Sequence, residues 1–284
     1  MNLNELRRSY HRRVCSEIIR IQSGNPNYPN FADKTNKASR QIAWGIVERI
    51  GGISAIDNLK GQTTGGRFEG ATCDFIQQAF DLLQHLRPGR WRYATGMAIS
   101  EFDQYKHLAD LERLVEGSNE LATALGKEYI ITPDIVVGRY PVIDDDINAK
   151  GEVISPQQSI ARFTPLRSEN ATQQHCLLHA SISCKWTLRS DRGQNARTEA
   201  LNLIRHRKGN LPHIMAITAE PLPTRIASLA LGTGDLDCVY HFALDEMREA
   251  IIATENEDQM DMLETLIQGR RLRDISDLPF DLAI

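Results

Sequence analysis

Asp134, Lys185 and Glu199 are the residues whose types and spacing could do chemistry. Asp134 lies in the β-branched run KEYIITPDIVVGRY, Lys185 ends the alternating run SISCK, and Glu199 follows fourteen residues later in a segment typical of a helix. Neighbouring strands could bring the aspartate and the lysine to one point, and a carboxylate on the next helix could reach it. Carboxylates and a backbone carbonyl form an oxygen-rich site suited to Mg²⁺, beside which a lysine could orient or deprotonate a bound water.

Each of these residues also has an ordinary explanation. An aspartate at a strand end forms turns, a lysine there is solvated, and a glutamate on a helix faces water. Short motifs of this kind have low specificity, so spacing alone leaves both interpretations open.

A basic cluster follows the lysine directly. Arg189, Asp191 and Arg192 have the chemistry to read C·G pairs, because arginine binds guanine O6 and N7 together and aspartate accepts from cytosine N4. Between Lys185 and Lys208 there are seven lysines and arginines against two acids. A solvated helix start with internal salt bridges would give the same charge pattern, and this alternative also stays open.

Composition restricts the classes of protein. The chain has 284 residues, 41% hydrophobic and 25% charged, as globular proteins do. Its net charge is −4, so any nucleic-acid site must be a local basic surface. The five cysteines form no C-x-x-C pair, which argues against disulfides and structural zinc. No segment has the apolar length of a signal or membrane span, and we expect a cytoplasmic protein with no membrane partner.

The order of apolar patterns predicts an α/β fold in one domain, 1–284. An all-helical part, about 1–127, should pack on an α/β core, about 128–284. GQTTGGRFEG at 61–70 is typical of a glycine-rich loop, with Glu69 near the start of the next helix. Helices are expected over 3–21, 38–50, 68–86, 102–125, 193–209 and 245–253, and strands over 127–140, 177–187, 211–221 and 238–244. Residues 141–172 indicate a long irregular excursion.

Several runs together resemble one family of nucleases. The runs are ITPD, HASISCKWT, RSDR, QNARTE, LPHI, TAEP and DCVYHFAL. They are similar to the NgoMIV-type restriction endonucleases, which have a PD-(D/E)-x-K fold and cut sites containing CCGG. The resemblance implies a mixed central sheet flanked by helices and a Mg²⁺-dependent type II endonuclease.

The resemblance also implies roles for the catalytic residues. The implied metal ligands are Asp134, Glu199 and the main-chain carbonyl of Cys184, with a pair of Mg²⁺ ions per active site. Lys185 is the catalytic lysine, and Glu69 matches an additional acid. The position two residues before the lysine usually holds an acid, and here it is Ser183, a departure known for this subgroup. Strand alternation turns the Cys184 side chain away from the lysine side, towards the core.

Base reading and partners follow from the same resemblance. Arg189, Asp191 and Arg192 match residues that read the inner CCGG. Three more residues match positions that the family uses near the outer base pair: Asp33, Gln62 and Arg225. The implied site is GCCGGC, cut after the first G to leave a 5′-CCGG overhang.

A palindromic site requires a two-fold assembly. The family resemblance implies a homotetramer of two dimers on double-stranded DNA, paired in function with a DNA methyltransferase. One alternative is a DNA-binding protein of this family that is inactive or differs in specificity. Another is a small-molecule α/β enzyme, although the sequence has neither a nucleotide-binding loop nor a nucleophile–base pair.

Overall fold

A six-stranded mixed sheet forms the centre of the computed structural model, in the order β10-β9-β8-β7-β4-β3. The strands are β3 (Trp91–Thr95), β4 (Ile135–Arg139), β7 (Leu177–Lys185), β8 (His213–Thr218), β9 (Cys238–His241) and β10 (Leu272–Asp274). From β7 to β10 the strands are parallel, whereas β4 is antiparallel to both β7 and β3. The structure describes residues 1–52, 61–117, 119–120, 123, 131–155, 157, 160–168, 175–188, 190–232 and 234–284. The expected α/β fold with a mixed central sheet is confirmed.

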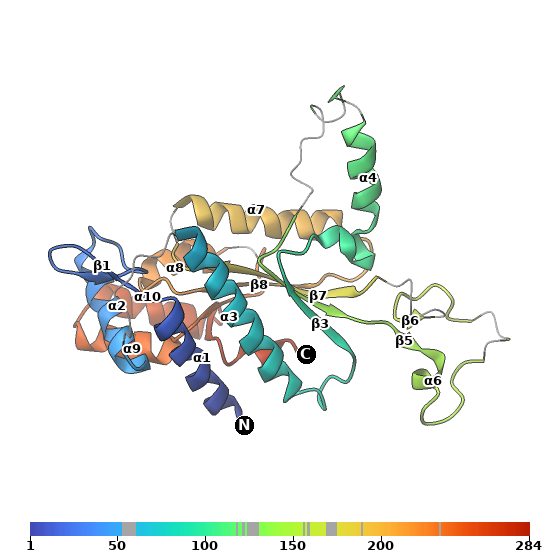
Figure 1. The fold of residues 1–284 in the computed structure, drawn as a ribbon, viewed down its shortest axis with the longest axis horizontal. Helices are drawn as coiled ribbons and strands as arrows, with labels where there is room; N and C mark the ends of the chain where they lie inside the picture. Colours follow the sequence, from blue (N-terminus) through green and yellow to red (C-terminus); the bar gives the residue numbers. More distant parts are fainter. Residues whose placement is uncertain are drawn as a thin grey trace.

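Helices cover the sheet and account for most of the remaining core (Figure 1). Helices α1 and α3 pack against each other, as do α2 and α9, and α3 also contacts β7. The helices are α1 (Leu3–Glu17), α2 (Lys37–Ile50), α3 (Gly61–Asp81), α4 (His107–Glu116), α6 (Asp144–Ile147), α7 (Ser190–His206), α8 (Pro223–Ala230), α9 (Leu244–Ala253), α10 (Glu257–Gln268) and α11 (Leu278–Asp281). Two 3-10 turns, η1 (Ile99–Glu101) and η2 (Asp103–Tyr105), precede α4.

The N-terminal part is not all helical, contrary to the sequence prediction. β3 lies within it and pairs with β4 across the boundary expected near residue 127. A small sheet of β1 (Ile21–Gln22) and β2 (Tyr28–Pro29) follows α1. Five residues such as WRYAT are too few for periodicity to separate a strand from a helix, and the partner strand decides the outcome.

The glycine-rich segment 61–70 is helical rather than a loop. It forms the first turns of α3, so Glu69 lies well inside the helix and not near its start. Thr64 is buried and Phe68 is fully buried, and this packing outweighs the low helix propensity of the glycines.

Two segments extend away from the sheet (Figure 1). One contains α4. The other is the expected excursion, which carries β5 (Val142–Ile143), α6 and β6 (Arg167–Ser168), with β5 and β6 parallel. Within the described ranges, no helix is both long and apolar enough to cross a membrane.

Candidate active site

Two adjacent strands bring Asp134 and Lys185 together. Asp134 immediately precedes β4, and Lys185 is the last residue of β7. Because the strands are antiparallel and Ile135 pairs with Ile182, the start of one lies beside the end of the other. The sequence predicts that Asp134 ends its strand, whereas it precedes β4. Because β4 runs antiparallel to β7, Asp134 still lies beside Lys185. Pro133 lies just outside the strand, where its missing N–H removes no ladder hydrogen bond.

One oxygen of Asp134 accepts three hydrogen bonds from the end of β7. Its Oδ2 accepts from the Cys184 backbone N–H at 2.6 Å, from Lys185 Nζ at 2.9 Å and from Ser183 Oγ at 3.4 Å. None of these contacts uses Oδ1. The hydroxyl of Ser183 contacts Asp134 at the position where an acid would place a second negative charge beside it.

Two further carboxylates, on helices, share this environment. Glu69 comes from α3 and Glu199 from α7, and both are partly buried. Burial raises the pKa of each carboxyl; the charge of Asp134 raises it further, and that of Lys185 lowers it. The four side chains therefore form one electrostatic group.

Lys185 is held in its charged form. Burial by itself would lower the pKa of the ammonium group, but the charge and hydrogen bond of Asp134 and the charge of Glu199 outweigh it and raise the pKa above its ordinary value. The lysine is thus a stable cation among three carboxylates.

An aromatic cluster fixes the end of β7. Trp186 follows Lys185 and packs edge-on against Phe68 at 5.0 Å and Phe31 at 5.5 Å between ring centroids. Phe68 directly precedes Glu69, so one contact sets the position of both the lysine and the glutamate. Cys184 is a buried free cysteine, which confirms that its side chain belongs to the core.

The donor atoms of this group fit a hard divalent cation. In the part of the chain that the structure describes, no three His, Cys, Asp or Glu side chains alone could hold a metal ion. The set expected from the sequence needs only Asp134, Glu199 and the carbonyl of Cys184, because Mg²⁺ retains several waters. Three carboxylates around one ammonium leave an excess of negative charge, which a cation would offset.

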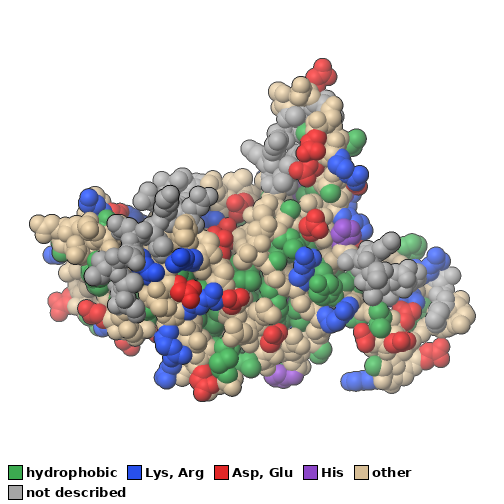
Figure 2. Space-filling view, viewed as in Figure 1, with side chains coloured by type: hydrophobic (Ala, Val, Ile, Leu, Met, Phe, Trp, Pro, Cys, Tyr) green, Lys and Arg blue, Asp and Glu red, His purple; other side chains and the backbone are tan. Residues whose placement is uncertain are grey.

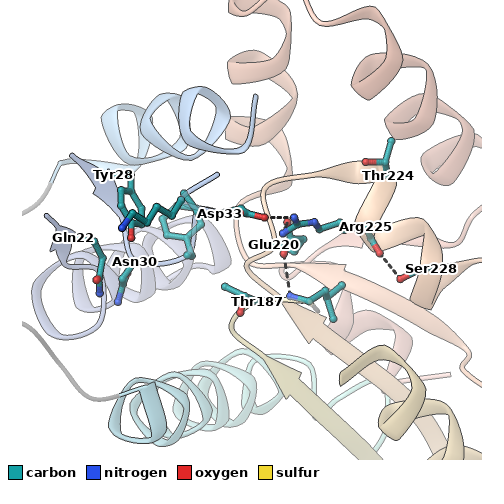
Figure 3. A pocket seen from close by; sticks show the side chains of 13 residues that line it. Gln22, Tyr28, Asn30, Asp33, Thr187, Glu220, Thr224, Arg225 and Ser228 are labelled. Carbon is teal, nitrogen blue, oxygen red and sulfur yellow. Dashed lines mark hydrogen bonds and ion pairs between the residues drawn. The ribbon is translucent and has the colours of Figure 1, made fainter. Parts of the chain in front are cut away.

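A pocket of about 670 Å³ lies beyond the end of β7 and contains Asp33 and Arg225. Asp33 comes from the segment before α2, Arg225 from α8, and the two form an ion pair (Figure 3). Hydrogen bonds from Arg225 and Thr35 lower the pKa of Asp33 to about 2. Thr187 and Leu188, two and three residues after Lys185, line the same pocket.

Glu220 also lines this pocket, and the sequence analysis did not single it out. Its side chain is only 1% exposed. Burial raises the pKa of Glu220 to about 7, against the effect of N–H donors and Arg225. The only sequence signal was an acid placed directly after an apolar strand, in TAEP.

Other predicted base-reading residues are not fully described. Arg189 lies outside the described residues. The backbones of Asp191 and Arg192 form the first turn of α7, and Gln62 is the second residue of α3, but their side chains lie outside the described part.

The aspartate that precedes β4, the lysine that ends β7 and the two helix-borne carboxylates form one charged group at the junction of two strands of the mixed sheet. The chain belongs to the NgoMIV restriction enzyme family, whose model matches residues 10–284. It is 45% identical over 283 residues to the type II restriction enzyme NgoMIV of Neisseria gonorrhoeae, covering 98% of this chain and 97% of that protein. It is thus a type II restriction endonuclease, a site-specific endonuclease.

Two solved structures show weaker likeness. One is a complex of restriction endonuclease PspGI with substrate DNA, with 16% identity and a TM-score of 0.35 over 78% of this chain and 60% of the other. The second is the type IIF restriction endonuclease Bse634I with cognate DNA, with 11% identity and a TM-score of 0.32 over 91% of this chain and 98% of the other.

Proposed function

We propose that this endonuclease hydrolyses double-stranded DNA at G/CCGGC with Mg²⁺ and leaves 5′-CCGG overhangs. The observation that carries the chemistry is the contact of Asp134 with Lys185 at the junction of β4 and β7. Glu69 and Glu199 support the proposal, because the charges of Asp134 and Lys185 both act on the pKa of each of these two carboxyl groups.

Each catalytic residue has a distinct role in this proposal. Asp134, Glu199 and the Cys184 carbonyl would hold Mg²⁺, a pair of ions per active site, which would supply positive charge at the scissile phosphate. Lys185 donates a hydrogen bond to a phosphate oxygen and offsets charge that develops there. Glu69, whose pKa is raised by burial, can accept a proton close to the reacting atoms.

Inner bases are read by Arg189, Asp191 and Arg192. Only Trp186, Thr187 and Leu188 separate Lys185 from this cluster, and α7 begins within it. If Lys185 points at the scissile phosphate, this cluster therefore lies close to the adjacent major groove. The same helix carries Glu199, so cleavage and reading depend on one continuous segment.

Asp33, Gln62 and Arg225 read the outer base pair. A guanidinium can donate to guanine O6 and N7, while a carboxylate accepts from cytosine N4. The ion pair of Asp33 with Arg225 supports this role, because it presents both groups side by side, as one G·C pair requires.

The assembly follows from the symmetry of the site. A palindrome pairs with a two-fold dimer, and we propose a homotetramer of two dimers. Acidic and basic side chains are mixed on the face seen in Figure 2, and with a net charge of −4 the DNA contacts must be local. Restriction in a cell also requires a companion methyltransferase, and we propose cytoplasmic action.

Plasmid cleavage tests the proposal directly. The protein is incubated with a plasmid of known sequence, with and without Mg²⁺, and the ends are sequenced. Lys185→Ala should abolish cleavage, and Lys106→Ala, at an exposed lysine that pairs with Asp103, is the matched control.

Mg²⁺-dependent cuts at G/CCGGC are the expected result. Cuts at CCGG with other outer base pairs would contradict the outer-base roles and leave the catalytic roles standing. Specific binding without any cut would favour the alternative of an inactive DNA-binding member of the family.

A further inference from the structure

Glu220 occupies the pocket of Asp33 and Arg225, yet neither the catalytic nor the base-reading roles above include it. It lies two residues beyond β8, and its side chain turns into the pocket between the segment that follows β7 and α8 (Figure 3). A carboxylate this deeply buried normally needs partners, and its partners indicate what it does.

The side chain of Glu220 connects two DNA-reading segments. One oxygen, Oε2, accepts the backbone N–H of Leu188 at 3.0 Å, and Leu188 is the residue before Arg189. The other, Oε1, accepts the N–H of Leu222 at 3.4 Å, and Leu222 is the residue that precedes α8. Oε1 also lies 3.8 Å from Nη1 of Arg225, on α8 itself.

Arg225 is held between two carboxylates of different exposure. Asp33 is partly exposed, with 24% of its side chain accessible, whereas 1% of the side chain of Glu220 is. If Asp33 turns to accept from a cytosine, Glu220, which is ionised above its pKa of about 7, remains as the anionic partner that keeps the guanidinium oriented. Arginine loses less conformational freedom when a second partner already fixes its plane.

We propose that Glu220 is a positioning residue for reading of the outer base pair: it holds Arg225 towards the guanine and ties α8 to the segment that leads into Arg189. This inference rests on the proposed function, because it assumes that Arg225 contacts that base pair. Glu220 itself does not touch DNA.

The test measures kcat/KM on four duplexes that share the inner CCGG and differ only in the outer base pair. Glu220→Gln keeps the shape and removes the charge. Glu249→Gln is the matched control, since Glu249 is an exposed glutamate that pairs with Arg49. We expect Glu220→Gln to lower kcat/KM about tenfold or more on GCCGGC and to change it little on the other three duplexes, while Glu249→Gln changes none.

A double variant separates positioning from general support of the fold. In an Arg225→Ala background, Glu220→Gln should have no further effect on the outer-base preference. The proposal would be overturned if Glu220→Gln alone lowered kcat/KM equally on all four duplexes or left the outer-base preference unchanged. It would also be overturned if Glu220→Gln reduced that preference by the same factor in the Arg225→Ala background. Glu220→Asp, which keeps the charge but withdraws it from Arg225, gives the same comparison if the glutamine variant does not fold.

Failure of the proposed function has a different signature. Wild-type protein that cuts all four duplexes equally, or prefers another outer pair, contradicts the outer-base assignment before any Glu220 variant is made. Wild-type preference for GCCGGC that Glu220→Gln leaves intact contradicts only the role of Glu220.

Discussion

Replacing Glu220 by glutamine should change how protein stability depends on pH. Burial raises the pKa of this carboxyl from 4.5 to about 7 in the folded protein, whereas the unfolded chain keeps the ordinary value. The folded state therefore binds the proton more tightly. The stability that the group contributes is fully present below the unfolded pKa and is lost as pH rises through about 7. A pKa difference of this size corresponds to about 3 kcal/mol.

Urea unfolding of the wild type and of Glu220→Gln, at pH 5 and pH 8.5 without divalent cations and at one protein concentration, measures this effect. Relative to the variant, the wild type should lose about 2.5 kcal/mol of unfolding free energy between pH 5 and pH 8.5, because a small part of the loss has already occurred at pH 5. Glutamine cannot ionise, so differences in packing contribute equally at both pH values and cancel. Glu249→Gln, at an exposed site, should show no such change. An equal difference between wild type and Glu220→Gln at both pH values would refute the burial argument.

Three further variants test other parts of the structure. Lys185→Ala should lower cleavage by about 10²–10⁴-fold or more and leave DNA binding largely intact, and wild-type turnover would remove Lys185 from the catalytic group. Arg192→Ala should lose about 1–3 kcal/mol of discrimination against other sequences, whereas an equal loss on random DNA would make it a phosphate contact. Gly45→Ala should cost about 1–3 kcal/mol in urea unfolding, because the new Cβ would lie 2.6 Å from Cβ of Ala250 where α2 meets α9. A neutral result would show that the two helices separate easily.

The central strands and the contact of Asp134 with Lys185 could be predicted because their signals are local. IVVG is an apolar, mostly β-branched run, and LLHASISCK ends in an apolar–polar alternation. Both have the length of a strand, and nearly every residue in them is buried. Asp134 and Lys185 each adjoin such a run, so pairing the runs brings them together. The direction of pairing was left open, and it places Asp134 at a strand start.

Other features depend on packing that sequence patterns do not encode. The glycines of segment 61–70 favour a loop, but the burial of Thr64 and Phe68 extends α3 through them. Asp33 and Arg225 are 192 residues apart, and only the family resemblance suggested that they belong together. No local pattern distinguishes Glu220 from a surface glutamate, since its function depends on the burial that the fold imposes.

In the proposed function, cleavage and both kinds of base reading converge on the short segment from Lys185 to Ser190. Trp186 is locked in the aromatic cluster beside Glu69, and Leu188 donates its N–H to the carboxylate that faces Arg225. If Leu188 moved away from Glu220, Trp186, two residues earlier, would have to move as well. The ring of Trp186 is packed against Phe31 and Phe68, which opposes that movement. Since packed cores have few alternative arrangements, movement at the outer-base pocket should reach Lys185 directly. Under the proposed function, correct base reading and correct placement of the lysine are therefore one structural condition.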